Sequence, residues 1–261
     1  MADIRPDISR YKVLIFDLFH TLSSMHHSDV PGLYSHEIIG ISYEKWLEAL
    51  FTDSERRTRG VITDPLEIIR DITGKLGLNI PDKTISELAR IRYERFELAL
   101  KNILPHTVAT LKELKQRGKT LILLSNADVC EIKGWPHSPA APYFDHAIFS
   151  CHVGFVKPEP QIYDLAIKLS GASKKECLFI GDGGSDELAG AKNFGIAACF
   201  TSEFIKDLWP EHIESRKLIA DYHIDRIDQL LYKSEPNIEY ADEFEMNEIL
   251  SDTELLKKLK K

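Results

Sequence analysis

The amino-acid sequence predicts an α/β fold, in which a Rossmann-like parallel sheet core carries an inserted helical cap domain. Short apolar runs of strand length recur at residues 12–16, 120–124, 146–149, 177–180, 196–200 and 222–224. Amphipathic helical stretches lie between the later runs. About a hundred residues separate the first run from the second, whereas one helical crossover needs only about a dozen. An additional unit is therefore expected in this gap.

The strand and helix patterns are those of a doubly wound sheet. The apolar runs are nearly continuous rather than alternating, as expected for parallel strands that helices cover on both faces. Residues 160–169 place Ile162 and Leu165 on one helical stripe that ends before Gly171. A second helix is expected to start near Ser185 and to end at Gly195.

The gap between the first two strands is helical by pattern. Apolar residues recur at helical spacing in 43–51 and again in 85–100. Pro105 then starts the true crossover helix. We therefore expect a catalytic core formed by residues 1–22 and 104–234, a helical cap at 23–103 and a C-terminal extension at 235–261. The extension is acidic and ends in lysines, which favours a solvated tail or a peripheral helix.

Composition excludes some partners. The chain has 261 residues, 43% of them hydrophobic, and a net charge of -8. Nucleic acids and anionic membranes both require a basic face, so neither is expected as a partner. A small anionic molecule is compatible with this charge, because a metal ion or a few cations can reverse the field within one cleft.

The cysteines and the N-terminus indicate a cytoplasmic protein. The four cysteines show no C-x-x-C spacing, and three lie in or beside apolar runs, which predicts buried free thiols in a reducing compartment. The charged N-terminus has no signal-peptide core. No apolar run approaches the roughly 20 residues that span a bilayer. Monomer and homodimer are both left open.

Polar residues follow four of the predicted strands. Asp17 follows the first, Ser125 and Asn126 end the second, Lys157 follows the third, and Asp182 with Asp186 follows the fourth. Each of these residues alone could be a helix cap, a turn residue or a solvated side chain. Ligands of open α/β sheets bind at the carboxyl ends of the strands. We therefore expect these side chains to form one site.

This order of motifs resembles that of the haloacid dehalogenase superfamily. The residues that carry the resemblance are Asp17 and Thr21, Ser125, Lys157, and Gly181-Asp182…Asp186. The resemblance covers about residues 11–230. It implies a hydrolase with a Rossmann-like core and a helical cap, acting on a small-molecule substrate.

The same residues suit the hydrolysis of a phosphate monoester, which requires a nucleophile and cancellation of the negative charge. Asp17 is expected to attack and to form an aspartyl intermediate. The expected Mg²⁺ ligands are Asp17, Asp182, Asp186 and the backbone carbonyl of Phe19. Ser125 or Thr21 would bind phosphoryl oxygens, and Lys157 would hold both the nucleophile and the transferred group.

Phe19 departs from the phosphatase pattern. Most phosphatases of this superfamily have a second Asp there as the general acid, and losing that acid costs about 10²–10⁴-fold in rate. The adjacent His20 is a candidate to replace it and to contact the substrate, although a ring that points away from the substrate is favoured. An aromatic residue at this position resembles the metal-independent 2-haloacid dehalogenases, which lack the full acidic pair. Two unpaired carboxylates beside Asp17 would be costly without a cation, so a phosphatase is favoured.

Two alternatives remain open: a 2-haloacid dehalogenase, and a catalytically weak ligand-binding or regulatory protein. Within the cap, Arg57 and Arg59 are candidate contacts for an anionic substrate, although a solvated turn is the favoured explanation of these arginines. His26 and His27 are candidates for the entrance to the site.

Overall fold

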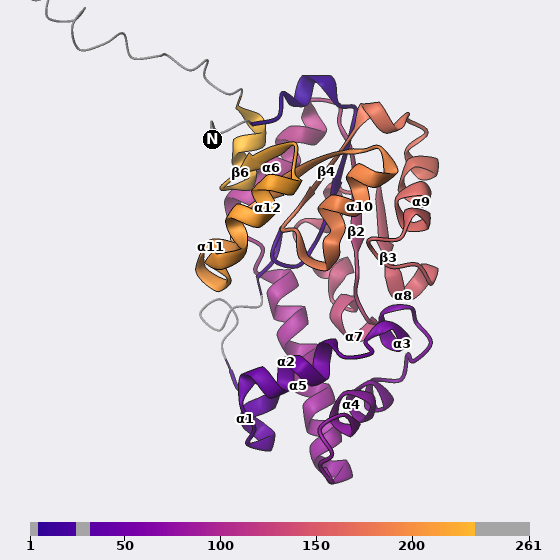
Figure 1. Ribbon diagram of the computed structural model, residues 1–261, viewed down its shortest axis with the longest axis vertical. Helices are drawn as coiled ribbons and strands as arrows, with labels where there is room; N and C mark the ends of the chain where they lie inside the picture. The colour runs from indigo at the N-terminus through magenta and orange to yellow at the C-terminus, as the bar shows by residue number, and fades with distance from the viewer. Residues whose placement is uncertain (1–4, 25–31, 233–261) are drawn as a thin grey trace, which may run out of the picture.

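The computed structural model describes residues 5–24 and 32–232. A six-stranded parallel sheet forms its centre, in the order β3-β2-β1-β4-β5-β6 (Figure 1). This confirms the predicted fold class. The strands are β1 (Val13–Phe16), β2 (Thr120–Ser125), β3 (His146–Phe149), β4 (Cys177–Gly181), β5 (Ala197–Thr201) and β6 (Tyr222–Ile224).

The sheet has a topological switch point between β1 and β4. From β1 the chain adds β2 and β3 on one side, and β4, β5 and β6 on the other. Loops leaving adjacent strands in opposite directions open a crevice at the carboxyl ends of those strands, where ligands of such folds bind. The two motifs that begin with Asp17 and Asp182 follow these two strands.

Both faces of the sheet are buried. Along β1, Leu14 and Phe16 belong to one apolar cluster, whereas Val13 and Ile15 belong to the other. Helices cover both faces, which explains the continuous apolar runs in the sequence. The crossover helix that leads into β2 is α6 (Pro105–Gln116). The helices after β2 are α7 (Val129–Ile132), α8 (Ser150–Val153), α9 (Pro160–Ser170), α10 (Glu187–Phe194), α11 (Ile205–Leu208) and α12 (Ile213–Ile219).

In the described residues between β1 and α6 there are five helices, and we call them the inserted helices. They are α1 (Ser35–Ile39), α2 (Tyr43–Phe51), α3 (Glu55–Thr58), α4 (Pro65–Gly74) and α5 (Asp82–Lys101). They gather at one end of the molecule, beyond the ends of the strands (Figure 1). Their own apolar cluster includes Trp46, Ile68 and Leu88.

Local sequence defines where these helices begin. The Ser42 hydroxyl accepts a hydrogen bond from the backbone N–H of Lys45 at the start of α2. The Asp64 carboxylate accepts from two backbone N–H groups at the start of α4, where Pro65 occupies the first helical position. Both are typical helix N-terminal signals.

Short 3-10 turns complete the described structure: Ile8–Arg10, Trp135–His137, Ala141–Tyr143, Lys174–Glu176, Gly184–Asp186, Pro210–His212 and Ile227–Leu231. The four cysteines are free and buried, as the sequence predicts. Within residues 5–24 and 32–232, no helix has the length and apolar character needed to cross a membrane. The acidic C-terminal extension, like His26 and His27, lies outside the described residues.

Candidate active site

Asp17 is the first residue after β1 and lies at the switch point. Its backbone N–H donates to the carbonyl of Ile180 on β4, at 2.9 Å. Its side chain is buried, with 6% of the residue exposed. Asp17 is therefore held in position by the sheet itself.

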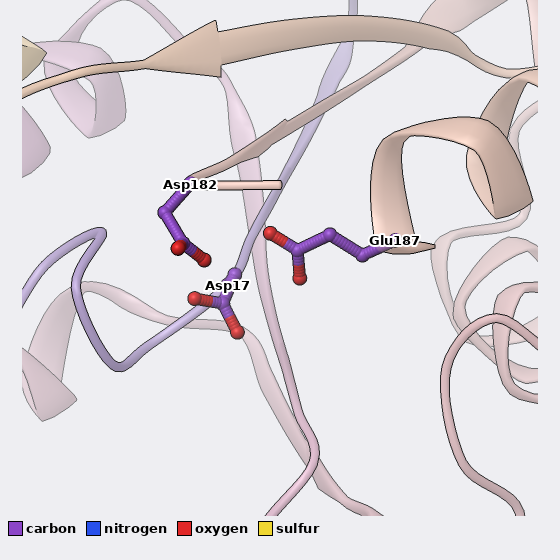
Figure 2. Close-up of side chains that lie close together, drawn as sticks. All are labelled: Asp17, Asp182 and Glu187. Atoms are coloured by element: carbon purple, nitrogen blue, oxygen red, sulfur yellow. The ribbon is translucent and has the colours of Figure 1, made fainter. Parts of the chain in front are cut away.

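Two further buried carboxylates lie beside Asp17. Asp182 and Glu187 each bring a carboxylate oxygen to within 4.8 Å of the others, and the three side chains point toward one another (Figure 2). Burial, and then the charge of Asp17, raise the pKa values of Asp182 and Glu187. Gathering three carboxylates away from water is unfavourable unless a cation binds them. The oxygen donors suit a hard divalent cation such as Mg²⁺.

The third carboxylate belongs to Glu187 rather than to Asp186. Ser185 and Asp186 both adopt left-handed backbone conformations, with φ of 52°. The chain therefore still turns at Asp186, and α10 begins only at Glu187. In this arrangement Asp186 is exposed and Glu187 is buried. We accordingly replace Asp186 with Glu187 in the candidate metal site.

Glycine at position 181 makes room for the Glu187 side chain. A Cβ atom at Gly181 would lie 2.1 Å from Glu187 Oε1. That same oxygen accepts a hydrogen bond from the backbone N–H of Gly183, at 3.0 Å. The Gly181-Asp182-Gly183 segment therefore supplies both the space and a donor for the glutamate.

Lys157 links two of the carboxylates. Its Nζ lies 2.5 Å from Asp17 Oδ1 and 2.5 Å from Glu187 Oε2. Burial alone would lower the pKa of Lys157, but the charges of Asp17 and Glu187 outweigh burial and raise it. Lys157 is therefore cationic and holds the side chain of Asp17 in place.

Asn126 positions the loop that carries Lys157. The Asn126 side-chain amide donates to the carbonyl of Lys157 at 2.9 Å and accepts from its backbone N–H at 2.7 Å. These paired bonds fix the Lys157 backbone against the end of β2. Asn126 thus acts through Lys157.

Arg216, on α12, is a site residue that the sequence did not reveal. Its Nη1 donates to the carbonyl oxygen of Asp182 at 2.7 Å and to Asp182 Oδ2 at 3.0 Å. Lys157 and Arg216 together face three carboxylates, so the anionic groups are in excess. Arg216 lies in a charged stretch that is typical of a solvated helix, and no motif distinguishes it.

Two buried hydroxyl groups at the strand edge lack partners. The Oγ of Ser125 and the Oγ1 of Thr21 are buried without any hydrogen-bond partner among the described residues. Buried polar groups are nearly always hydrogen-bonded in native proteins. Each hydroxyl therefore has unused hydrogen-bonding capacity, and neither residue is among those that line the cavities described below.

Phe19 and His20 lie on the same loop as Asp17. The Phe19 ring packs edge-on against Phe96 of α5, with ring centroids 5.2 Å apart. His20 adopts a left-handed conformation with φ of 62° and packs against Trp209. Burial lowers the pKa of His20, which favours the neutral ring.

Two cavities meet at this loop. The catalytic cavity, of about 270 Å³, is lined by the three carboxylates, Lys157 and Arg216, among others. The side cavity, of about 190 Å³, extends toward the inserted helices. The two share five lining residues: Phe19, His20, Phe51, Asn126 and Trp209.

Arg57 and Arg59 hold α3 to the core and line neither cavity. Arg57 is buried, donates to the carbonyl of Leu50 and lies 3.6 Å from Asp128. Arg59 makes a two-pronged contact with Glu159, at 2.7 and 3.0 Å. The arginines predicted to contact substrate therefore have protein partners.

Comparison with known proteins agrees with this architecture. A family model described as haloacid dehalogenase-like hydrolase matches residues 11–195. A glyceraldehyde 3-phosphate phosphatase from Methanothermobacter thermautotrophicus is 30% identical over 55% of this chain and 63% of its own, so the match spans less than two thirds of that relative. A second glyceraldehyde 3-phosphate phosphatase, from Methanocaldococcus jannaschii, is 26% identical over 84% of this chain and 95% of its own.

This chain is also similar in sequence to a dehalogenase and in fold to an enzyme solved with magnesium. An (S)-2-haloacid dehalogenase from Pseudomonas putida is 25% identical over 72% of this chain and 82% of its own. The structure of a Bacteroides thetaiotaomicron enzyme of this family, in complex with magnesium and inorganic phosphate, shares the fold with a TM-score of 0.56. It is 22% identical, and the match covers 73% of this chain and 94% of that one. This protein belongs to the haloacid dehalogenase-like hydrolases.

Proposed function

We propose that this hydrolase is a magnesium-dependent phosphatase of a small phosphorylated metabolite. The observation that carries the proposal is the group of three buried carboxylates, Asp17, Asp182 and Glu187. A metal-independent hydrolase has no need of two further carboxylates beside its nucleophile, and their mutual repulsion opposes that arrangement. The two phosphatase relatives support the same reading.

Asp17, Asp182 and Glu187 would hold the cation, together with the backbone carbonyl of Phe19. Magnesium binds through a few oxygen ligands and keeps several waters, so this donor set suits it. When bound, the ion offsets the negative charge of the phosphoryl group and of the carboxylates.

The remaining steps fall to the chain's own residues. Asp17 would attack the phosphorus atom through a carboxylate oxygen and form an aspartyl phosphate, while the bond to the leaving group breaks and releases an alkoxide or phenolate that takes up a proton from water. Water would then hydrolyse the aspartyl phosphate. Lys157 orients Asp17 and would contact the transferred group. The unpartnered hydroxyls of Ser125 and Thr21 would each donate to a phosphoryl oxygen.

Phe19 determines which leaving groups depart readily. A phenyl ring cannot donate a proton, and burial lowers the pKa of the neighbouring His20, which favours its neutral ring. A leaving group that needs little protonation, such as a phenol or a carboxylic acid, should therefore be released much faster than a simple alcohol.

A panel of phosphate monoesters and acyl phosphates, assayed with and without magnesium, tests the proposal. We expect magnesium-dependent release of phosphate. Glu187→Gln should weaken magnesium binding by about 10-fold or more in titration calorimetry, whereas Asp186→Asn, a change at the adjacent exposed carboxylate, should not. Equal magnesium affinity in wild type and Glu187→Gln would contradict the proposed metal site.

The second candidate is a 2-haloacid dehalogenase. The observation that favours it is Phe19, whose ring packs on Phe96 where the phosphatases of the superfamily place an acid. Halide needs no proton to leave, so an aromatic residue would not hinder that reaction. Halide release from 2-haloacids in the presence of a metal chelator would support this candidate and contradict the phosphatase.

A further inference from the structure

The side cavity has an apolar, largely aromatic wall. Five residues of α2 line it, at the helical spacing seen in the sequence: Tyr43, Trp46, Leu47, Leu50 and Phe51. Phe96 and Trp209 face the cavity from other elements. An engineered apolar cavity of about 150 Å³ is enough to bind benzene, so a cavity of about 190 Å³ accommodates a ring-sized group.

Two arginines of α5 line the same cavity, and they differ in their partners. Arg92 pairs with Asp128 at 2.9 Å and also with Glu131, so its charge is balanced within the protein. No ion pair joins Arg95 to a carboxylate within the described part of the chain. Its Nη1 donates to the carbonyl of Gly32 at 3.0 Å, and its guanidinium lies 3.6 Å from the centre of the Tyr34 ring.

Arg95 also has a buried donor that is not used. Only 6% of the residue is exposed, and Nη2 has no hydrogen-bond partner in residues 5–24 and 32–232. A buried donor without an acceptor is costly, and a buried charge without a counter-ion is more so. The guanidinium lies over the Tyr34 ring, which restricts its movement, and Arg95 is one of the residues that line the side cavity.

We propose that the side cavity binds a leaving group with an apolar, ring-sized body and a carboxylate, and that Arg95 binds the carboxylate. This inference rests on the proposed phosphatase function. The two cavities are adjacent, since Phe19 and His20 line both of them, and on this ground we place a phosphoryl group beside Asp17 and a ring beside α2 in one molecule. Phe19 suits the same substrate class, because a phenolic leaving group needs little help from an acid.

The binding experiment needs no turnover. Benzoate and its neutral isostere benzamide are titrated into the full chain with magnesium present. We expect benzoate to bind about 10- to 100-fold more tightly than benzamide, because a charge-assisted bond to Arg95 is available only to the anion. Arg95→Met should reduce this ratio to near one. Arg90→Met is the matched control, since Arg90 is exposed on the same helix and pairs with the exposed Glu94.

The kinetic experiment compares the carboxyphenyl phosphates, in all three ring isomers, with the corresponding carbamoylphenyl phosphates. The measured quantity is the ratio of kcat/KM between each acid and its amide. We expect at least one isomer to give a ratio of about 10 or more in wild type, and Arg95→Met to bring it near one. If Arg95→Met does not fold, Arg95→Lys replaces it, and its ratio should fall between those values.

The outcomes separate the two proposals. Failure of wild type to hydrolyse any phosphate would contradict the phosphatase, while the benzoate titration would still decide whether Arg95 forms a carboxylate site. Turnover of acid and amide at equal rates, with equal affinity for benzoate and benzamide, would overturn the inference about Arg95 and leave the phosphatase standing.

Discussion

Residues from the carboxyl ends of the strands, a region that we call the strand edge, line the same two cavities as the inserted helices. The two regions differ in how their charged groups are paired. At the strand edge, three buried carboxylates face two cations, and two buried hydroxyls have no partner in the described structure. In the inserted helices, the charges of Arg57, Arg59 and Arg92 are matched by carboxylates of the core. Matched charges fasten one unit to the other, whereas unmatched groups indicate where a ligand binds. Arg95 resembles the strand edge in this respect, because it pairs with no carboxylate among the described residues and has a buried donor without a partner there.

The largest effect should come from the strand edge. Asp17→Asn removes the attacking carboxylate while keeping the size of the side chain, so turnover should fall by about 10⁴-fold or more. The far-ultraviolet circular dichroism should be unchanged, because the amide fits the same space at the end of β1. Appreciable activity in cleanly purified Asp17→Asn protein would show that another residue is the nucleophile.

The buried pairs of the inserted helices should affect stability instead. Arg92→Met leaves Asp128 buried with less charge compensation, and Asp128 is fully buried. Removing one partner of such a pair typically costs about 3–5 kcal/mol of unfolding free energy. Urea denaturation measures this loss, and Arg90→Met on the exposed side of α5 is the control. If Arg92→Met unfolds at the wild-type urea concentration, the pair does not fasten the helices to the core.

A substitution of Phe19, in the loop between the two regions, should change the preference between alkyl and aryl phosphates. Phe19→Asp places a carboxyl group where the leaving group departs, which should speed alkyl phosphates relative to aryl phosphates by about 10- to 100-fold. The ratio of the two rates within one preparation is the quantity to measure, because a cavity left by the ring also loosens the contact with Phe96. Equal rates for alkyl and aryl phosphates in wild type would indicate that another group donates the proton, and His20 would be the first candidate.

The sequence was most informative where one strand edge collects the polar residues. Asp17, Asp182 and Lys157 follow three parallel strands, and the carboxyl ends of such strands meet in space. Glu187 was missed because the Asp182-to-Asp186 spacing matches a motif, while two consecutive left-handed residues are not visible in composition. Arg216 is held by tertiary structure alone, with no local pattern to reveal it.

The inserted helices were predicted as helices, but the partners of their side chains were not. The apolar stripe of α2 predicts a buried face, yet part of that face lines a cavity and leaves Phe51 67% exposed. The arginines beside Gly60 looked suited to a ligand. Gly60 was more informative than the arginines about this turn, because a Cβ atom there would lie 2.0 Å from the carbonyl oxygen of Cys151. The glycine therefore marks the close approach of this turn to the core.

The smallest effect should come from the partly exposed pair between Arg59 and Glu159. Their side chains are 25% and 32% exposed, so solvent screens the interaction and its loss should cost about 0.5–1 kcal/mol. Glu159 lies two residues after Lys157 and also accepts from the backbone N–H of Val156, so Glu159→Gln should disturb the loop as well as the pair. A double-mutant cycle with Arg59→Met separates the two effects, because only the coupling energy reports the contact between the two side chains. We expect positive coupling in unfolding free energy and a small loss of kcat in Glu159→Gln, since the loop holds Lys157 beside Asp17. Strictly additive effects would mean that this pair does not help to fasten α3 to the core and that Arg57, which lies on α3 and faces Asp128, does so without it.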